Sequence, residues 1–161
     1  MDSLQEPRGG EALARALGRG AVAGVAGTAV MTAFQKGVEM PLTGRGDSYA
    51  PADLAYKLLP IRSRRRRTRR RVNYATHFAL GIGWGMARGA VSRAELRGQK
   101  AVATVFATMW PGDVAIVTAL KLDDPRRWSG RDLAIDVVDK LVLAQATGVI
   151  YDRLSRSSRS A

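Results

Sequence analysis

Apolar residues gather in four long stretches that alternate with polar and charged segments. The stretches cover residues 20–38, 72–91, 101–120 and 133–151. A helix of about 20 mostly apolar residues spans the ~30 Å hydrocarbon layer of a bilayer, so each stretch is long enough to cross a membrane. They are too long and too rich in alanine for strands. We therefore predict an all-α fold: a four-helix transmembrane bundle with Gly/Ala-rich helix contacts.

Glycines recur in these stretches at a helical spacing. Gly81, Gly85 and Gly89 are four residues apart in the second stretch, and Gly20 and Gly24 share this spacing in the first. Such glycines line one face of a helix and let a second backbone approach closely in lipid. Inside a water-soluble helix each would cost about 1 kcal/mol relative to alanine. We expect these five glycines to pack helices together.

The polar segments divide a single membrane domain, 1–161. A polar N-terminal segment (1–19) precedes the first stretch, a basic loop (39–71) joins the first two, and a basic tail (152–161) follows the fourth. Within the loop, Pro51 opens a short amphipathic helical pattern that Pro60 stops. Ser129, with Asp132 three residues later, predicts a capping box at the start of the fourth helix.

Composition adds a strong positive charge. The chain has 26 Lys+Arg against 14 Asp+Glu, a formal net charge of +12. Eight basic residues fall in one ten-residue window: Arg62, Arg64, Arg65, Arg66, Arg67, Arg69, Arg70 and Arg71. A block of like charge this dense repels itself, so it stays solvated or lies on a polyanion.

The position of this block favours a lipid partner. Clusters of basic residues beside a membrane helix bind anionic headgroups and fix the cytoplasmic side. We therefore expect contacts with anionic lipid, the loops 39–71 and 121–131 in the cytoplasm, and both termini outside. Binding of nucleic acid is less expected, because no aromatic residue for base stacking lies between Tyr56 and Tyr74.

Several chemistries are excluded by residue counts. The chain has no Cys and one His, which removes disulfides, thiol nucleophiles, thiolate metal sites and multi-histidine metal sites. No arrangement of nucleophile, base and oxyanion donors can be assembled from the remaining residues. We expect no enzyme activity, and we assign no catalytic, cofactor-binding or metal-binding residue.

Five ionisable residues lie within the predicted spans, where charge is costly: His77, Asp113, Asp136, Asp139 and Lys140. Because consecutive helices run in opposite directions, all five fall in the half of the bilayer that faces the Arg-rich loop. We predict that they form a polar cluster, with Lys140 paired to Asp136 four residues earlier. Such residues fix helix register through mutual ion pairs, or they relay protons or cations. Both interpretations stay open.

Several segments together carry a family resemblance. The segments are 20–33, 73–81 (NYATHFALG) continued by Trp84 and Gly85, 124–129 (DPRRWS), and 132–138. With them the chain resembles a group of small multi-pass membrane proteins of unknown function, common in actinobacteria. The resemblance covers most of the chain after residue 20. It implies a multi-helix membrane protein and supplies no activity.

We therefore expect a multi-pass integral protein of the plasma membrane, a structural or accessory component with a lipid-facing polybasic loop. Its glycine faces suit a homo-oligomer or a membrane partner. One alternative is a small proton- or ion-coupled transporter or channel component. A second is a soluble basic helical protein that binds nucleic acid.

Overall fold

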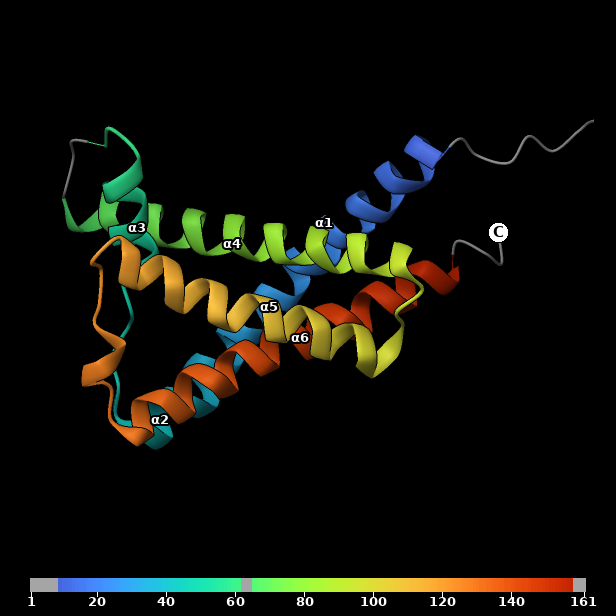
Figure 1. Cartoon of the computed structure of the whole chain (residues 1–161). Helices are drawn as coiled ribbons and strands as arrows, with labels where there is room; N and C mark the ends of the chain where they lie inside the picture. The colour runs from blue at the N-terminus through green and yellow to red at the C-terminus, as the bar shows by residue number, and fades with distance from the viewer. Residues whose placement is uncertain (1–8, 62–64, 158–161) are drawn as a thin grey trace, which may run out of the picture.

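The computed structural model describes residues 9–61 and 65–157, and this part of the chain is all-helical, as predicted (Figure 1). The main elements are α1 (Gly9–Phe34), α2 (Met40–Thr43), α3 (Ala50–Leu58), α4 (Arg66–Val91), α5 (Gly98–Ala119) and α6 (Gly130–Ser157). A π-helical turn, Gln35–Glu39, joins α1 to α2 without a break, and 3-10 turns cover Ser92–Ala94 and Pro125–Arg127. No strand occurs among the described residues.

The four long helices form a bundle around α1. This helix makes its most extensive contact with α4 and a second one with α6, whereas α5 packs mainly on α6. One end of the bundle, here the loop end, carries α2, α3 and the connection from α5 to α6. The opposite end carries the start of α1 and the turn from α4 to α5. Toward the loop end, α6 diverges from α4 (Figure 1).

Glycines bring α1 and α4 together. A Cβ atom added to Gly20 or Gly24 would lie closer than 3.0 Å to the carbonyl oxygen of Gly85 or Gly81, respectively. Gly89 meets the backbone of Ala16 in the same way. Real Cβ atoms do not approach backbone this closely, so larger residues require the helices to separate. We refer to Gly20, Gly24, Gly81, Gly85 and Gly89 as the glycine seam.

The outer surfaces of the long helices are apolar. In the ranges 20–34, 72–91, 101–119 and 133–151, every exposed residue is apolar except Thr108, Thr118 and Gln145. All six charged or histidine side chains in these ranges are buried or half-buried. The interior meanwhile contains polar groups, including fully buried Thr28 and Arg88. The core is nevertheless mainly apolar, and the feature that departs from a water-soluble helix is the apolar outer face.

Two helical segments of the described residues are long and apolar enough to cross a membrane: Gly10–Thr43 and Gly98–Ala119. Their most apolar windows are only 33% and 22% buried, unlike the core helix of a soluble protein. The predicted spans in α4 and α6 form helices but do not pass this test of composition. In α6 the reason is charge, because Asp136, Asp139 and Lys140 lie within the apolar stretch. In α4 the reason is low hydropathy, because glycines and the polar residues His77 and Arg88 interrupt the stretch.

Three segments predicted as polar or loop regions are partly helical, which corrects those boundaries. Residues 9–19 belong to α1, residues 66–71 of the predicted basic loop open α4, and residues 152–157 extend α6. The prediction of a loop from charge repulsion underestimated the helix propensity of arginine, which is a good helix former when its guanidinium is solvated. Arg69 also binds Asp53 at 3.1 Å and lies over the ring of Tyr49. Arg62 and Arg64 lie outside the described residues.

Local predictions around the loop end agree with the structure. The pattern after Pro51 is helix α3, which packs on α4. Asn73 of α4 holds this region, because its side chain accepts a hydrogen bond from Ala52 N and donates one to Ser48 O, both at 3.0 Å. The capping box forms at α6: the Ser129 hydroxyl and backbone N–H both donate to Asp132, and Asp132 N–H donates to the Ser129 hydroxyl.

Candidate functional site: a polar cavity at the loop end

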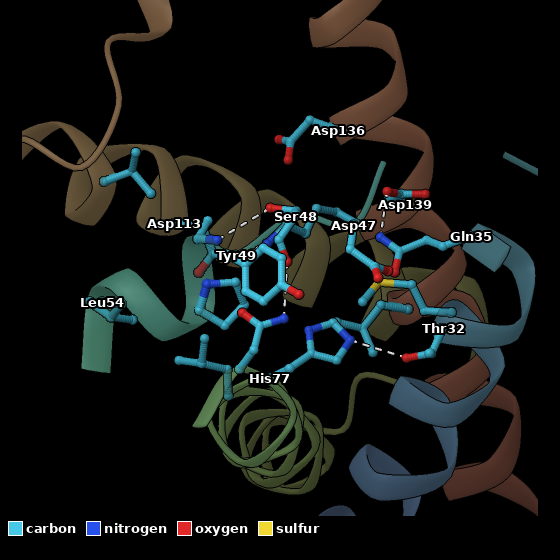
Figure 2. Close-up of a pocket in the computed structure, with 18 of the residues that line it drawn as sticks. Thr32, Gln35, Asp47, Ser48, Tyr49, Leu54, His77, Asp113, Asp136 and Asp139 are labelled. Atoms are coloured by element: carbon cyan, nitrogen blue, oxygen red, sulfur yellow. Dashed lines mark hydrogen bonds and ion pairs between the residues drawn. The ribbon is translucent and has the colours of Figure 1, made fainter. Parts of the chain in front are cut away.

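An open cavity of about 600 Å³ lies at the loop end, where α6 diverges from α4. Its walls come from the C-terminal part of α1, the π-helical turn, the segment 45–49, α3, α4, α5 and α6. The five residues of the predicted polar cluster all line it: His77, Asp113, Asp136, Asp139 and Lys140. Figure 2 shows four of them, from three different helices, around one space.

The ion pair of the cluster joins two helices. Lys140 of α6 donates to Asp113 of α5, and their side chains are 24% and 18% exposed. The predicted pairing of Lys140 with Asp136 is therefore wrong, because a partner on the neighbouring helix lies closer. Asp136 instead accepts a hydrogen bond from the Trp110 ring N–H at 2.9 Å. Both contacts fix α5 against α6.

His77 connects α4 to α1. Its Nε2 lies 3.2 Å from the hydroxyl of Thr32. That hydroxyl donates a hydrogen bond to the carbonyl oxygen of Thr28 at 2.8 Å. Threonine has a single hydroxyl proton, so His77 Nε2 carries the proton and donates to Thr32. The histidine is thereby fixed at the cavity wall (Figure 2).

Asp139 is the most buried carboxylate of the cavity, with 9% of its surface exposed. Its Oδ2 accepts a hydrogen bond from the Gln35 side-chain amide at 2.7 Å, as Figure 2 shows. Its Oδ1 is buried and has no hydrogen-bond partner among the described residues. Gln35 is the first residue of the π-helical turn, a distortion of helices that is frequent at functional sites.

The cavity is acidic although the chain is strongly basic. Eight carboxylates but only four Lys or Arg side chains line it. Two of the carboxylates are neutralised within the cavity, Asp113 by Lys140 and Asp47 by Lys36 at 2.8 Å. A third, Asp53, is paired with Arg69, and the remaining five carboxylates outnumber the two other lining cations, Arg45 and Arg70. The excess favours a negative potential, which low-dielectric walls concentrate.

A second polar site lies at the opposite end, and the sequence analysis missed it. The Arg88 side chain is 2% exposed; its guanidinium binds Asp152 at 2.5 Å and lies 4.5 Å from the ring centre of Tyr151. The Tyr151 hydroxyl is hydrogen-bonded to Ser92 at 2.8 Å. Arg88, Ser92, Tyr151 and Asp152 form what we term the Arg88 cluster. Asp152 was overlooked because the fourth helix was predicted to end at residue 151.

A basic surface extends over the loop end. Arg65, Arg66, Arg67, Arg70 and Arg71 are exposed at the start of α4. Leu58 and Leu59, at the end of α3, are also exposed. Cationic heads beside exposed leucines are the combination that a lipid headgroup region binds.

Neither the fold nor the cavity is tied to a known protein by similarity. No protein-family model matches the chain, and no curated protein or solved structure matches it either. Within 9–61 and 65–157, no group of three or more His, Asp or Glu side chains is arranged to hold a metal ion.

Proposed function

We propose that the protein is a multi-pass integral protein of the plasma membrane, in which α1, α4, α5 and α6 all cross the bilayer. It acts as a structural or accessory membrane component. One observation carries the proposal: the exposed surface of these four helices is apolar over the length of a span, while their charged side chains point inward. An apolar surface of this extent is stable in lipid and prone to aggregation in water.

The charges within residues 72–91 of α4 and 133–151 of α6 are compatible with spanning because none of them is exposed. His77, Asp136, Asp139 and Lys140 line the cavity, and Arg88 is enclosed in its cluster. Ionisable residues of membrane helices face the bundle interior in this way, paired with one another or exposed to a water-filled space. Averaging hydropathy along α4 and α6 hides this segregation.

The three polar exceptions on the outer surface also suit lipid. The hydroxyls of Thr108 and Thr118 donate to the carbonyl oxygens of Thr104 and Val114 within α5, at 2.9 and 2.7 Å. Gln145 exchanges two side-chain hydrogen bonds with Gln99. A polar group without a hydrogen-bond partner costs about several kcal/mol in hydrocarbon. These three side chains avoid that cost because they are hydrogen-bonded.

Single-cysteine labelling tests the topology, and the Cys-free chain provides a clean background. Leu59→Cys reports on the loop end and Glu95→Cys on the α4–α5 turn, both at exposed positions. With four spans, an impermeant maleimide applied to the cytoplasmic face labels Leu59→Cys only, and from the outer face it labels Glu95→Cys only. Spans in α1 and α5 alone would place both cysteines on the same side. Extraction of the wild-type chain by alkaline carbonate would contradict any membrane-spanning form.

The arginines of the loop end provide the lipid contact in this proposal. Replacing four of them with glutamine should weaken the binding of anionic lipid in mixed nanodiscs and lower its salt dependence: Arg66, Arg67, Arg70 and Arg71. A matched control removes four exposed arginines near the opposite end, namely Arg15, Arg93, Arg97 and Arg153. Each basic residue near an anionic surface contributes about 1 kcal/mol. Equal losses in both variants would show that only net charge matters.

The cavity favours a second candidate, a proton- or ion-coupled conductor. Asp113 and Lys140 form its interhelical ion pair, and His77 donates at its wall. A reconstituted conductor should lose flux when Asp113→Asn removes the charge of this pair. Flux that is absent in the wild-type chain, or unchanged in the variant, would remove this candidate and leave the structural function.

A further inference from the structure

The cavity has the dimensions and the walls of a small-molecule site. Its volume of about 600 Å³ falls within the ~300–1,000 Å³ typical of ligand pockets. Apolar side chains, among them Met31 and Leu143, and the aromatic rings of Tyr49, Trp84 and Trp128 share its lining with the carboxylates. A lone inorganic ion would use little of this space or of its apolar surface.

Four of the lining carboxylates receive hydrogen bonds from neutral donors only, within the described residues. Glu39 accepts from Thr43 at 2.8 Å, Asp132 from Ser129, Asp136 from Trp110, and Asp139 from Gln35. A neutral donor adds no opposite charge to the carboxylate. A cation that entered the cavity would find charges that no ion pair of the described residues neutralises.

Asp139 provides the point at which a ligand would bind most tightly. It is nine-tenths buried, it lines the cavity, and its Oδ1 lacks a hydrogen-bond partner among the described residues. A buried acceptor left unsatisfied costs about 1–3 kcal/mol, which a donor group on a ligand would recover. An ammonium group is such a donor, and it also supplies the missing positive charge.

The carboxylates of α6 form a row rather than a point. Asp132, Asp136 and Asp139 lie on one side of the helix, and a rise of ~1.5 Å per residue spaces the first and last by about 10 Å along its axis. This row suits an elongated cation with an ammonium group near each end and a methylene stem between them. The stem would contact Met31 and Leu143, and aromatic faces favour the ammonium groups.

We propose that this cavity binds a small alkyl diamine or polyamine, with one ammonium group on Asp139 and another on Asp136 or Asp132. This ligand deepens the proposed function, because it gives the membrane component a specific small-molecule partner. Arg45, which also lines the cavity, lies close enough to interact electrostatically with Asp132 and Asp139. It competes with the ligand for these carboxylates.

Purified protein in detergent micelles, titrated with 1,4-diaminobutane, tests the proposal. Intrinsic tryptophan fluorescence reports binding directly, because Trp84 and Trp128 line the cavity and the Trp110 ring N–H is hydrogen-bonded to Asp136. Calorimetry gives the affinity. The neutral analogue 1,4-butanediol tests the need for charge, and KCl at equal ionic strength tests for a general salt effect.

Isosteric variants locate the site. Asp139→Asn should weaken diamine binding about ten-fold or more, because a desolvated charge pair is lost. Asp136→Asn retains an acceptor for Trp110 and should also weaken binding, and it serves as the test if Asp139→Asn does not fold. Glu95→Gln, exposed at the other end, is the charge-matched control and should have no effect. Arg45→Gln should strengthen binding about two- to five-fold, since it removes the competing cation.

The proposal is overturned if the diamine does not saturate, if the diol or KCl produces the same response, or if both Asp variants retain wild-type affinity. These outcomes are separable from the membrane topology. A chain that resists carbonate but ignores the diamine loses the ligand and keeps the proposed function. A chain that carbonate extracts but that binds the diamine through Asp139 loses the membrane function and keeps the ligand site.

Discussion

The two ends of the bundle bury charged groups in opposite ways. At the Arg88 cluster the arginine side chain is 2% exposed, and its guanidinium is held between one carboxylate and one aromatic ring. At the loop end, Lys140 and Asp113 also form an ion pair, but they line an open cavity that contains further carboxylates. At the first end the cation is enclosed while its partner Asp152 is 27% exposed, whereas at the loop end both members of the pair are partly exposed to the cavity.

Helix spacing accounts for the difference. Gly85 and Gly89 lie one turn or less from Arg88 and hold α1 against α4 at that end. Farther along α4, Trp84 and His77 face the cavity, and Met31 and Gln35 of the α1 region do the same. The glycine seam reaches the cavity as well, because Gly81 lines it, so the difference lies in α6, which meets α4 at Arg88 and diverges from it toward the loop end. The following changes test this contrast, in order of decreasing expected effect.

Asp152→Asn should be the most destabilising single change. It leaves Arg88 buried with no charge to balance it, and loss of one partner from a buried pair costs about 3–5 kcal/mol. Thermal unfolding in detergent, followed by circular dichroism, measures the loss. The double variant Arg88→Met/Asp152→Asn should recover much of it, because it leaves no uncompensated charge in the interior. A double variant that is less stable than the single one would refute this account of the closed end.

Gly85→Ala tests the spacing itself. The new Cβ would collide with backbone of α1, so we expect a loss of about 3 kcal/mol in the free energy of unfolding. Gly83→Ala, two residues away with nothing within 4 Å of an added Cβ, is the matched control. It should be neutral or stabilising by up to about 1 kcal/mol. Equal effects of the two substitutions would mean that the glycine seam does not position α4.

Asp113→Asn should have a smaller effect than Asp152→Asn, although both remove the acid of an ion pair. The Lys140 ammonium is 24% exposed and lies in a cavity with other carboxylates, so it is not left without compensation. We expect a loss of about 1 kcal/mol, near the range of partly solvated pairs. Parallel unfolding curves of the two Asn variants measure the contrast. A loss as large as that for Asp152→Asn would show that the cavity is as dry as the Arg88 cluster.

Ser129→Ala should have the smallest effect, about 1 kcal/mol or less, because it removes one capping residue of α6. Hydrogen bonds from the Ser129 side chain and backbone lower the pKa of the exposed Asp132 below its ordinary 3.8. A lowered pKa means that this stabilisation is present above pH 3.8 and is lost as the pH falls through the lowered value. Wild-type stability should therefore decline faster than that of Ser129→Ala in this acidic window. Parallel declines would contradict the capping contribution.

The sequence was sufficient to predict the long helices and to place five of the residues that line the cavity at one end of the bundle. Apolar stretches long enough for spans became helices, and the alternation of helix direction brought His77, Asp113 and Asp139 to one end. These inferences need only helical geometry and chain order. Similarly, the cap at Ser129 was predictable because its contacts are local.

Contacts between helices could not be derived in this way. Lys140 was assigned to Asp136 by spacing within one helix, but its partner Asp113 lies on another helix whose rotation the sequence does not fix. The neutral partners Gln35 and Trp110 were missed for the same reason. Arg88 shares a helix face with His77, a useful indication, but its link to Asp152 depends on where α6 ends.

The π-helical turn Gln35–Glu39 has a consequence for how such a cavity can arise. A π-helical turn is in effect an α-helix with one additional residue, so removing that residue restores the regular helix. Each residue turns an α-helix by about 100°, so the deletion would rotate the following segments about the helix axis by that angle. The 45–49 segment, which now lines the cavity and pairs with Lys36 through Asp47, would be rotated relative to α1. One inserted residue in a regular helix can thus change which segments line a cavity at its end.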